Sequence, residues 1–137
     1  MADITVQPLY LKDVVLTVDG DTYEKAVSSV MFTPTTSSAT FKGLDPAAVF
    51  TESGASTWVV DISYAQDWDT VGSLSAYLYD NEGSQVTLSF KPKSASGGTW
   101  SATVSIVAGA VGGAVDSFAV TTVQLPVQGK PTYTPAV

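Results

Sequence analysis

TWVVDISYAQDW, residues 57–68, opens the stretch of sequence that decides the fold. It continues as SLSAYLYDNEG (73–83), QVTLSFKPK (85–93), TWSATVSIV (99–107) and VDSFAVTTVQLPV (115–127). Apolar and polar residues alternate along 57–68, 85–93 and 99–107, which is typical of strands with one buried face. In 73–83 the apolar residues recur at helical spacing instead. The order strand, short helix, strand, strand, strand predicts a mainly β fold, an antiparallel sandwich or barrel-like domain with one short flanking α-helix.

The alternation assigns an inward and an outward face to each strand. The inward, apolar set is Trp58, Val60, Ile62 and Tyr64, then Val86, Leu88 and Phe90, then Trp100, Ala102, Val104 and Ile106. The outward, polar set is Asp61, Ser63, Thr87, Ser89, Ser101, Thr103 and Ser105. We therefore expect the first set to form the core and the second to face outward.

Composition limits the function more than the fold. The 137 residues are enough for one domain, residues 1–137, and contain neither Cys nor His. That composition excludes disulfides, thiolate metal sites and the usual histidine base or zinc ligand. The net charge of −7 disfavours binding to nucleic acid or to anionic membranes, and no stretch approaches the length of a membrane span. With 45% hydrophobic and only 14% charged residues, the surface is suited to burial against another copy.

The first half of the chain carries two predictions. Asp19-Gly20-Asp21 is expected to turn a hairpin between strands at 10–18 and 23–32. Residues 33–55 are expected to form a long loop, or arm, with a short strand at 39–42, because prolines and glycines interrupt any period. The apolar side chains of that loop need burial that a neighbouring subunit could supply, which makes them candidate inter-subunit contacts: Phe41, Leu44, Val49 and Phe50.

The helix is expected at 71–80, with Asp69 or Thr70 as its N-cap and Trp68 packed against its start. Leu74, Tyr77 and Leu78 would form its apolar stripe. Residues 128–137, with two prolines, are expected to form an extended C-terminal tail or an edge strand.

Glycoside hydrolysis and sugar binding are two alternatives that the residues of this chain support less well. Paired carboxylates can hydrolyse glycosides, but capping, turns and strand surfaces account for the acidic residues here: Asp61, Asp67, Asp69, Asp80 and Glu82. A sugar-binding sandwich would need exposed rings, and only Trp68, Tyr10 and Tyr133 remain once Trp58 and Trp100 are assigned to the core. We therefore expect no enzyme activity, no cofactor and no metal site.

The same segments resemble those of the major tail proteins, or tail tube proteins, of long-tailed bacteriophages with non-contractile tails. The resemblance lies in TWVVDI before the YAQDW turn, in SLSAYLYDNEG, TLSFKPK and TWSATVSIV, and above all in the ending GGAVDSFAVTTVQLPVQGKPT (112–132). It covers 57–132, about half of the chain.

This resemblance implies a structural virion protein, made in the cytoplasm of the host bacterium, whose hexameric rings stack into a hollow tube for DNA ejection. Its partners would be further copies of itself and other tail proteins, such as the tape measure and tail terminator proteins. DNA would pass through the lumen without specific binding, which suits a negatively charged chain without membrane contacts. Lys91 and Lys93 would then lie at an outer or inter-ring contact, and Ser101, Thr103 and Ser105 are the candidate lumen-facing residues. The alternative is a phage decoration or neck component, or a carbohydrate-binding adhesive module with the same sandwich.

Overall fold

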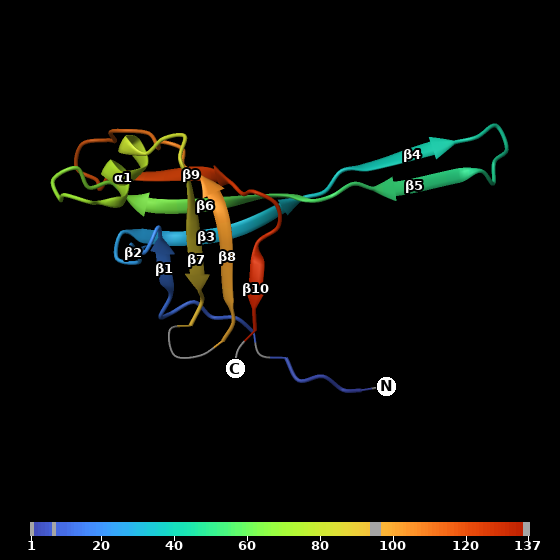
Figure 1. Cartoon of the computed structure of the whole chain (residues 1–137), viewed down its shortest axis with the longest axis horizontal. Coiled ribbons are helices and arrows are strands. Elements are labelled where there is room, and N and C mark those ends of the chain that lie inside the picture. The colour runs from blue at the N-terminus through green and yellow to red at the C-terminus, as the bar shows by residue number, and fades with distance from the viewer. Residues whose placement is uncertain (1, 7, 94–96, 136–137) are drawn as a thin grey trace.

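The computed structural model describes residues 2–6, 8–93 and 97–135, and it is mainly β (Figure 1). Every pair of neighbouring strands is antiparallel, and the described residues contain one α-helix, as the sequence predicted. The elements in chain order are β1 (Val15–Val18), β2 (Asp21–Thr22), β3 (Val27–Thr35), β4 (Ser38–Lys42), β5 (Val49–Ser53), β6 (Thr57–Ala65), α1 (Leu74–Asp80), β7 (Gln85–Lys91), β8 (Thr99–Ser105), β9 (Val120–Pro126) and β10 (Thr132–Thr134).

Two sheets form a sandwich-like body around one core. The larger sheet has five strands in the order β10-β8-β7-β1-β2, and the smaller has three in the order β3-β6-β9. The sheets meet where the chain leaves β9, since the amide of Gln128 donates to the carbonyl of Thr103 at 2.8 Å. On the opposite side β3 is an edge strand, so the body is open between β3 and β1.

The core comes from the faces that the alternation predicted. Its fully buried side chains include Val60 and Ile62 from the smaller sheet and Leu88 and Val104 from the larger. The tryptophans are less buried than predicted: Trp58 is half-buried, and Trp100 is partly buried, packs against the core and stacks on a neighbouring ring. Both are the second residue of their strands.

The helix starts later than expected. It begins at Leu74, and its N-cap is Ser73, whose hydroxyl accepts from the amide of Ala76 at 3.4 Å. Asp69 and Thr70 lie in the preceding turn, and their amides donate to the Asp67 carboxylate. The predicted stripe is confirmed by the buried Leu74 and Leu78 and the half-buried Tyr77.

The turn between β1 and β2 is confirmed, but its second strand is short. Asp19 and Gly20 both have positive φ, 51° and 86°, which is what a two-residue hairpin turn requires. Only Asp21 and Thr22 pair with β1, and the chain then crosses to the smaller sheet as β3. The long strand expected at 23–32 therefore belongs mostly to the other layer of the sandwich.

The expected loop at 33–55 is a β-hairpin arm. β3 runs on to Thr35, and β4 and β5 pair with each other over five residue pairs. The strand expected at 39–42 is present as β4, whereas the prediction missed β5. In the described part of the chain β4 and β5 pair with no other strand, and together they extend away from the body (Figure 1).

The C-terminal tail adds an edge strand. β10 pairs with β8 from Thr132 to Thr134, and Tyr133 stacks on Trp100 with ring centroids 4.7 Å apart. The prediction of an extended tail or edge strand is confirmed here, and its last two positions, 136 and 137, lie outside the described residues.

Candidate self-association surfaces

The β4–β5 arm has two chemically different faces. Phe41 and Phe50 are paired across the hairpin and share one face, with ring centroids 6.4 Å apart. Thr40 and Thr51 are the neighbouring pair on the other face, and their hydroxyls lie 3.1 Å apart. Because paired residues alternate between faces, the arm has an aromatic side and a hydroxyl side.

A compact turn closes the arm and exposes its tip. The amide of Gly43 donates to the carbonyl of Ala48 at 2.7 Å, and the Asp45 carboxylate accepts from the amide of Ala47 at 3.0 Å. Leu44 is fully exposed in this turn, between Lys42 and Asp45. The turn therefore presents the large apolar side chain of Leu44 between two residues of opposite charge, Lys42 and Asp45.

The structure places all four predicted contacts on the arm: Phe41 and Phe50 on its aromatic face, Val49 on its hydroxyl face and Leu44 in the turn. Phe41 is 67% exposed and Phe50 63%, and Leu44 and Val49 are also exposed. An exposed aromatic pair gains little from folding on a hairpin that pairs with no other strand among the described residues. The arm is thus a surface that would be stabilised by a partner.

Lys91 and Lys93 belong to another region. Lys91 is the last residue of β7, Lys93 follows it closely, and both are half-buried. That end of β7 lies away from the arm (Figure 1). The predicted contact residues are therefore split between the arm and the far end of the larger sheet, and residues 94–96 of the expected turn lie outside the described residues.

The candidate lumen residues lie on the outer face of the larger sheet. Ser101 and Thr103 in β8 pair with Ser89 and Thr87 in β7, so these hydroxyls form cross-strand rows on one face. Ser105 ends the row, opposite Gln85. Lys91 alone brings a charge to the β7 and β8 part of this face.

The outer face of the smaller sheet, unlike that of the larger sheet among the described residues, carries a carboxylate, that of Asp61. Asp61 in the central strand β6 lies between Met31 and Gln124. The Thr33 hydroxyl donates to Oδ2 of Asp61 at 3.4 Å. Oδ1 of Asp61 is buried and has no hydrogen-bond partner among the described residues. Leaving a buried acceptor unpaired is unfavourable, so this face would gain from a donor supplied by another molecule.

Sequence reasoning missed two further exposed apolar segments. Before β1 the exposed residues are Ile4, Val6, Leu9, Tyr10 and Leu11, and before β9 they are Val111, Val115 and Phe118. The residues of the second segment from 115 onward were expected to begin a strand, but β9 begins only at Val120. Gln66 anchors the segment instead, because its side chain exchanges hydrogen bonds with the backbone of Gly112 at 2.9 and 3.0 Å. The alternation of apolar and polar residues at 3–6 is a signal that could have identified the first segment.

The rings considered for sugar binding lie on separate elements. Trp68 precedes α1 and is 45% exposed, Tyr133 is in β10, and Tyr10 precedes β1. Trp68 meets Tyr79 edge-on, at 83°, rather than forming a flat platform with it. Stacking on a sugar needs a flat exposed ring face, so no shared platform is built from these residues.

The pKa shifts of Tyr77 and Asp67 arise from burial, charge and local hydrogen bonds. Burial and the charge of Asp19, which accepts a hydrogen bond from the Tyr77 hydroxyl, raise the pKa of Tyr77 to about 12. Hydrogen bonds from Thr70 and Asp69 lower the pKa of Asp67. Within the described residues, no cluster of acidic side chains is placed to hold a metal ion, and no helix is long and apolar enough to cross a membrane.

Comparison with models of protein families and with curated proteins found no match for this chain. The geometry offers an exposed amphipathic arm, open sheet edges and a broad hydroxyl face.

Proposed function

We propose that this chain is a tail tube protein, a structural protein of a phage virion that self-assembles into stacked rings around a hollow lumen. The observation that carries the proposal is the β4–β5 arm, which leaves the body with Phe41, Leu44 and Phe50 exposed. Exposed aromatic and aliphatic side chains on a projecting element are what an assembling subunit would bury against its neighbours.

The β4–β5 arm is a lone hairpin among the described residues, and its stability in water is marginal. Two strands without a third strand or a packed face are barely stable in water. Residues 38–53 nevertheless form a regular hairpin closed by hydrogen bonds at both ends, from Gly43 to Ala48 and from Gly54 to Ser37. Contact with another copy would bury the aromatic face and stabilise the arm in this form.

The sheet edges favour the same conclusion. β2, β10, β3 and β9 end the two sheets, and open edges tend to pair with other chains. In a closed ring each edge would meet that of a neighbour, which removes the exposed hydrogen-bonding groups. Self-association is thus supported by the backbone as well as by the apolar arm.

The charge distribution suits a conduit for DNA. The chain has 13 acidic and 6 basic residues, and the outer face of the larger sheet is mostly Ser and Thr. A wall with few basic side chains gains little affinity through counterions released from DNA. We therefore infer that Ser101, Thr103 and Ser105 face the lumen. Lys91, the last residue of β7 on the same face, would lie at the margin of the lumen where subunits meet, and Lys93 at a contact outside it.

The first test removes the apolar side chains of the arm and keeps its backbone. The triple variant Phe41→Ser, Leu44→Ser, Phe50→Ser is expected to stay monomeric in sedimentation velocity at concentrations where the unmodified protein forms rings or tubes. The matched control, Val71→Ser, removes an equally exposed apolar side chain beside α1 and should assemble normally. Equal assembly of the triple variant and the unmodified protein would refute the role of the arm.

The second test asks which sheet faces the lumen. Tubes carrying Ser101→Lys and Ser105→Lys are expected to retain duplex DNA at physiological salt, whereas unmodified tubes release it. The control pair, Thr122→Lys and Gln124→Lys, places the same charges on the outer face of the smaller sheet. DNA retention by the control pair alone would assign the lumen to the smaller sheet, and retention by unmodified tubes would contradict the conduit.

A further inference from the structure

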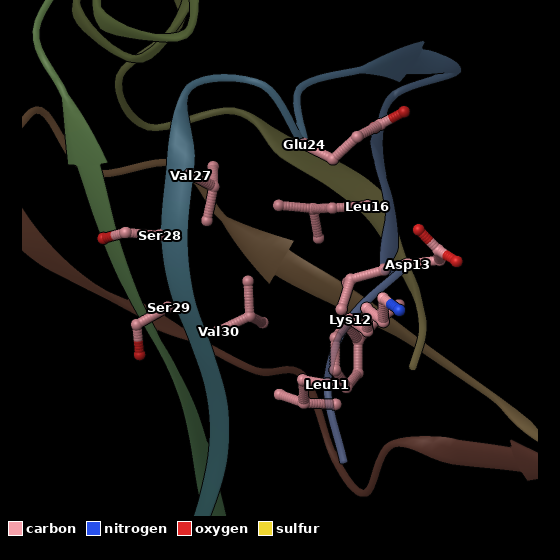
Figure 2. Close-up of a pocket in the computed structure, with 11 residues that line it drawn as sticks. Leu11, Lys12, Asp13, Leu16, Glu24, Val27, Ser28, Ser29 and Val30 are labelled. Carbon is pink, nitrogen blue, oxygen red and sulfur yellow. The ribbon is translucent and has the colours of Figure 1, made fainter. Parts of the chain in front are cut away.

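A pocket of about 390 Å³ opens at the side of the body where the two sheets do not meet. Figure 2 shows Val27 and Val30 of β3 pointing toward Leu16 of β1 and toward Leu11, across the gap between the two segments. Phe90 contributes to the lining, and its ring stacks on Phe32 at 6.0 Å. The pocket therefore has an apolar floor between the sheets.

Its polar residues lie at the rim. Lys12, Asp13 and Glu24 line the mouth and are exposed, while Ser28 and Ser29 point away from the cavity (Figure 2). Small-molecule sites use buried polar groups that converge on the ligand and orient it. A site with an apolar floor and charges only at its mouth fits an apolar side chain presented by another protein surface.

The arm of the same chain cannot fill this pocket. β4 rises by about 3.3 Å per residue, so its five residues place the turn roughly 16 Å beyond the start of β4, which itself lies beyond the end of β3. The arm also points away from the body in Figure 1. An arm that occupies the pocket must therefore come from a second copy.

We propose that the pocket between β1 and β3 receives the β4–β5 turn of a neighbouring copy, with Leu44 inserted against Val27, Val30 and Phe90. This inference rests on the proposed function, because it names the surface that one subunit offers to the arm of the next. The turn presents a fully exposed leucine, and the pocket is an open apolar recess on the same molecule. A contact between different patches of identical chains is heterologous, and such contacts generate rings or filaments.

Charge complementarity favours this occupant over the exposed apolar segment at 111–118. Lys42 and Asp45 flank Leu44 on the turn, and the rim carries both opposite charges, with Asp13 and Glu24 for Lys42 and Lys12 for Asp45. The segment at 111–118 offers only an acidic residue, Asp116, and no base. The arm tip thus matches the pocket in both its apolar centre and its charged border.

The direct test uses the absence of cysteine from the sequence. Leu44→Cys and Leu11→Cys proteins are purified separately, mixed under assembly conditions and treated with a short bifunctional maleimide. A covalent dimer is expected from the mixture and not from either variant alone. Leu11 is exposed at the pocket mouth, so its replacement leaves the core intact.

Two controls locate the contact. Leu44→Cys is mixed with Gln124→Cys, on the outer face of the smaller sheet, and Val71→Cys is mixed with Leu11→Cys. Neither mixture should give the dimer. Rings or tubes that form without the Leu44 to Leu11 cross-link would overturn the pocket assignment and leave the proposed function standing. Absence of assembly by the unmodified protein under the same conditions would overturn the proposed function as well.

A charge reversal tests the rim without entering the core. Lys42→Glu is expected to raise the concentration needed for assembly about threefold to fivefold, as for the loss of an exposed ion pair. Adding Asp13→Lys and Glu24→Lys to the same chain should restore assembly, because the charges are again opposite. The proposed pairing would be contradicted if the chain carrying Lys42→Glu, Asp13→Lys and Glu24→Lys assembled no better than Lys42→Glu alone.

Discussion

Replacing residues 36–56 by an Asn-Gly turn removes the whole β4–β5 arm and leaves the sandwich. Thr35 and Thr57 are paired where β3 meets β6, so a two-residue hairpin turn can join them directly. None of the core side chains lies between positions 36 and 56. The deletion should therefore leave the burial that stabilises the body unchanged.

The expected change in the free energy of unfolding is small and favourable. Shortening the connection about tenfold lowers the closure entropy by roughly 2 kcal/mol, whereas damage to the core would cost about 2 to 5 kcal/mol. Urea denaturation followed by tryptophan fluorescence should give a cooperative transition at the same or a higher midpoint. Sedimentation velocity of the same sample should show monomers only.

Two results would refute this reasoning. A free energy of unfolding lower by more than about 2 kcal/mol, or a loss of cooperativity, would show that the arm is part of the fold. Normal assembly of the shortened chain would show that the arm does not join subunits.

The remaining predictions concern the body. Leu88→Ala, in the fully buried core, should lower the free energy of unfolding by about 2 to 5 kcal/mol in urea denaturation, and the half-buried Trp100→Ala by less; the reverse order would place Trp100 at the centre of the core. Gly109→Ala should destabilise by about 1 to 3 kcal/mol, because its Cβ would collide with the hydroxyl and ring of the buried Tyr64; an unchanged thermal midpoint would contradict that packing. The raised pKa of Tyr77, about 12 against the ordinary 10.0, means that the unfolded chain loses the proton first as the pH rises. Stability should therefore be fully present below pH 10 and decline toward pH 12, more steeply than in Tyr77→Phe; parallel profiles for the two proteins would contradict the assigned shift.

The strands of the body could be predicted because each has one buried face. The alternation in 57–65 and 99–105 follows from a sheet covered on one side, and it placed Val60, Ile62 and Val104 correctly in the core. The same reasoning failed for the arm, since a hairpin with neither face buried has no inside and outside to alternate between. β5 was missed for that reason.

Other errors came from choices that local sequence leaves open. Asp67, Asp69 and Thr70 are all residue types that cap helices, yet the Asp67 carboxylate holds a turn and Ser73 caps the helix. The strand after Gly20 was expected to stay in the sheet of β1, but β3 crosses to the other sheet. Sequence gives the existence of a strand more readily than its partner, because pairing depends on the packing of both layers.

The candidate contacts were predicted only in part. Phe41, Leu44, Val49 and Phe50 stood out as apolar residues without a place in the expected core, and the structure gathers them on one arm. The pocket could not be predicted, since Leu11, Leu16, Val27 and Phe90 meet there from segments far apart in the chain. Its rim charges look like ordinary surface residues until the fold places them around one opening.

Electron microscopy of the concentrated, unmodified protein tests the central claim of self-assembly most directly. Negatively stained samples should show rings of uniform diameter with a central opening, and stacks of these rings as tubes of constant width. The triple variant Phe41→Ser, Leu44→Ser, Phe50→Ser should show neither under the same conditions. Isolated monomers at every concentration, or aggregates of irregular width, would contradict the account.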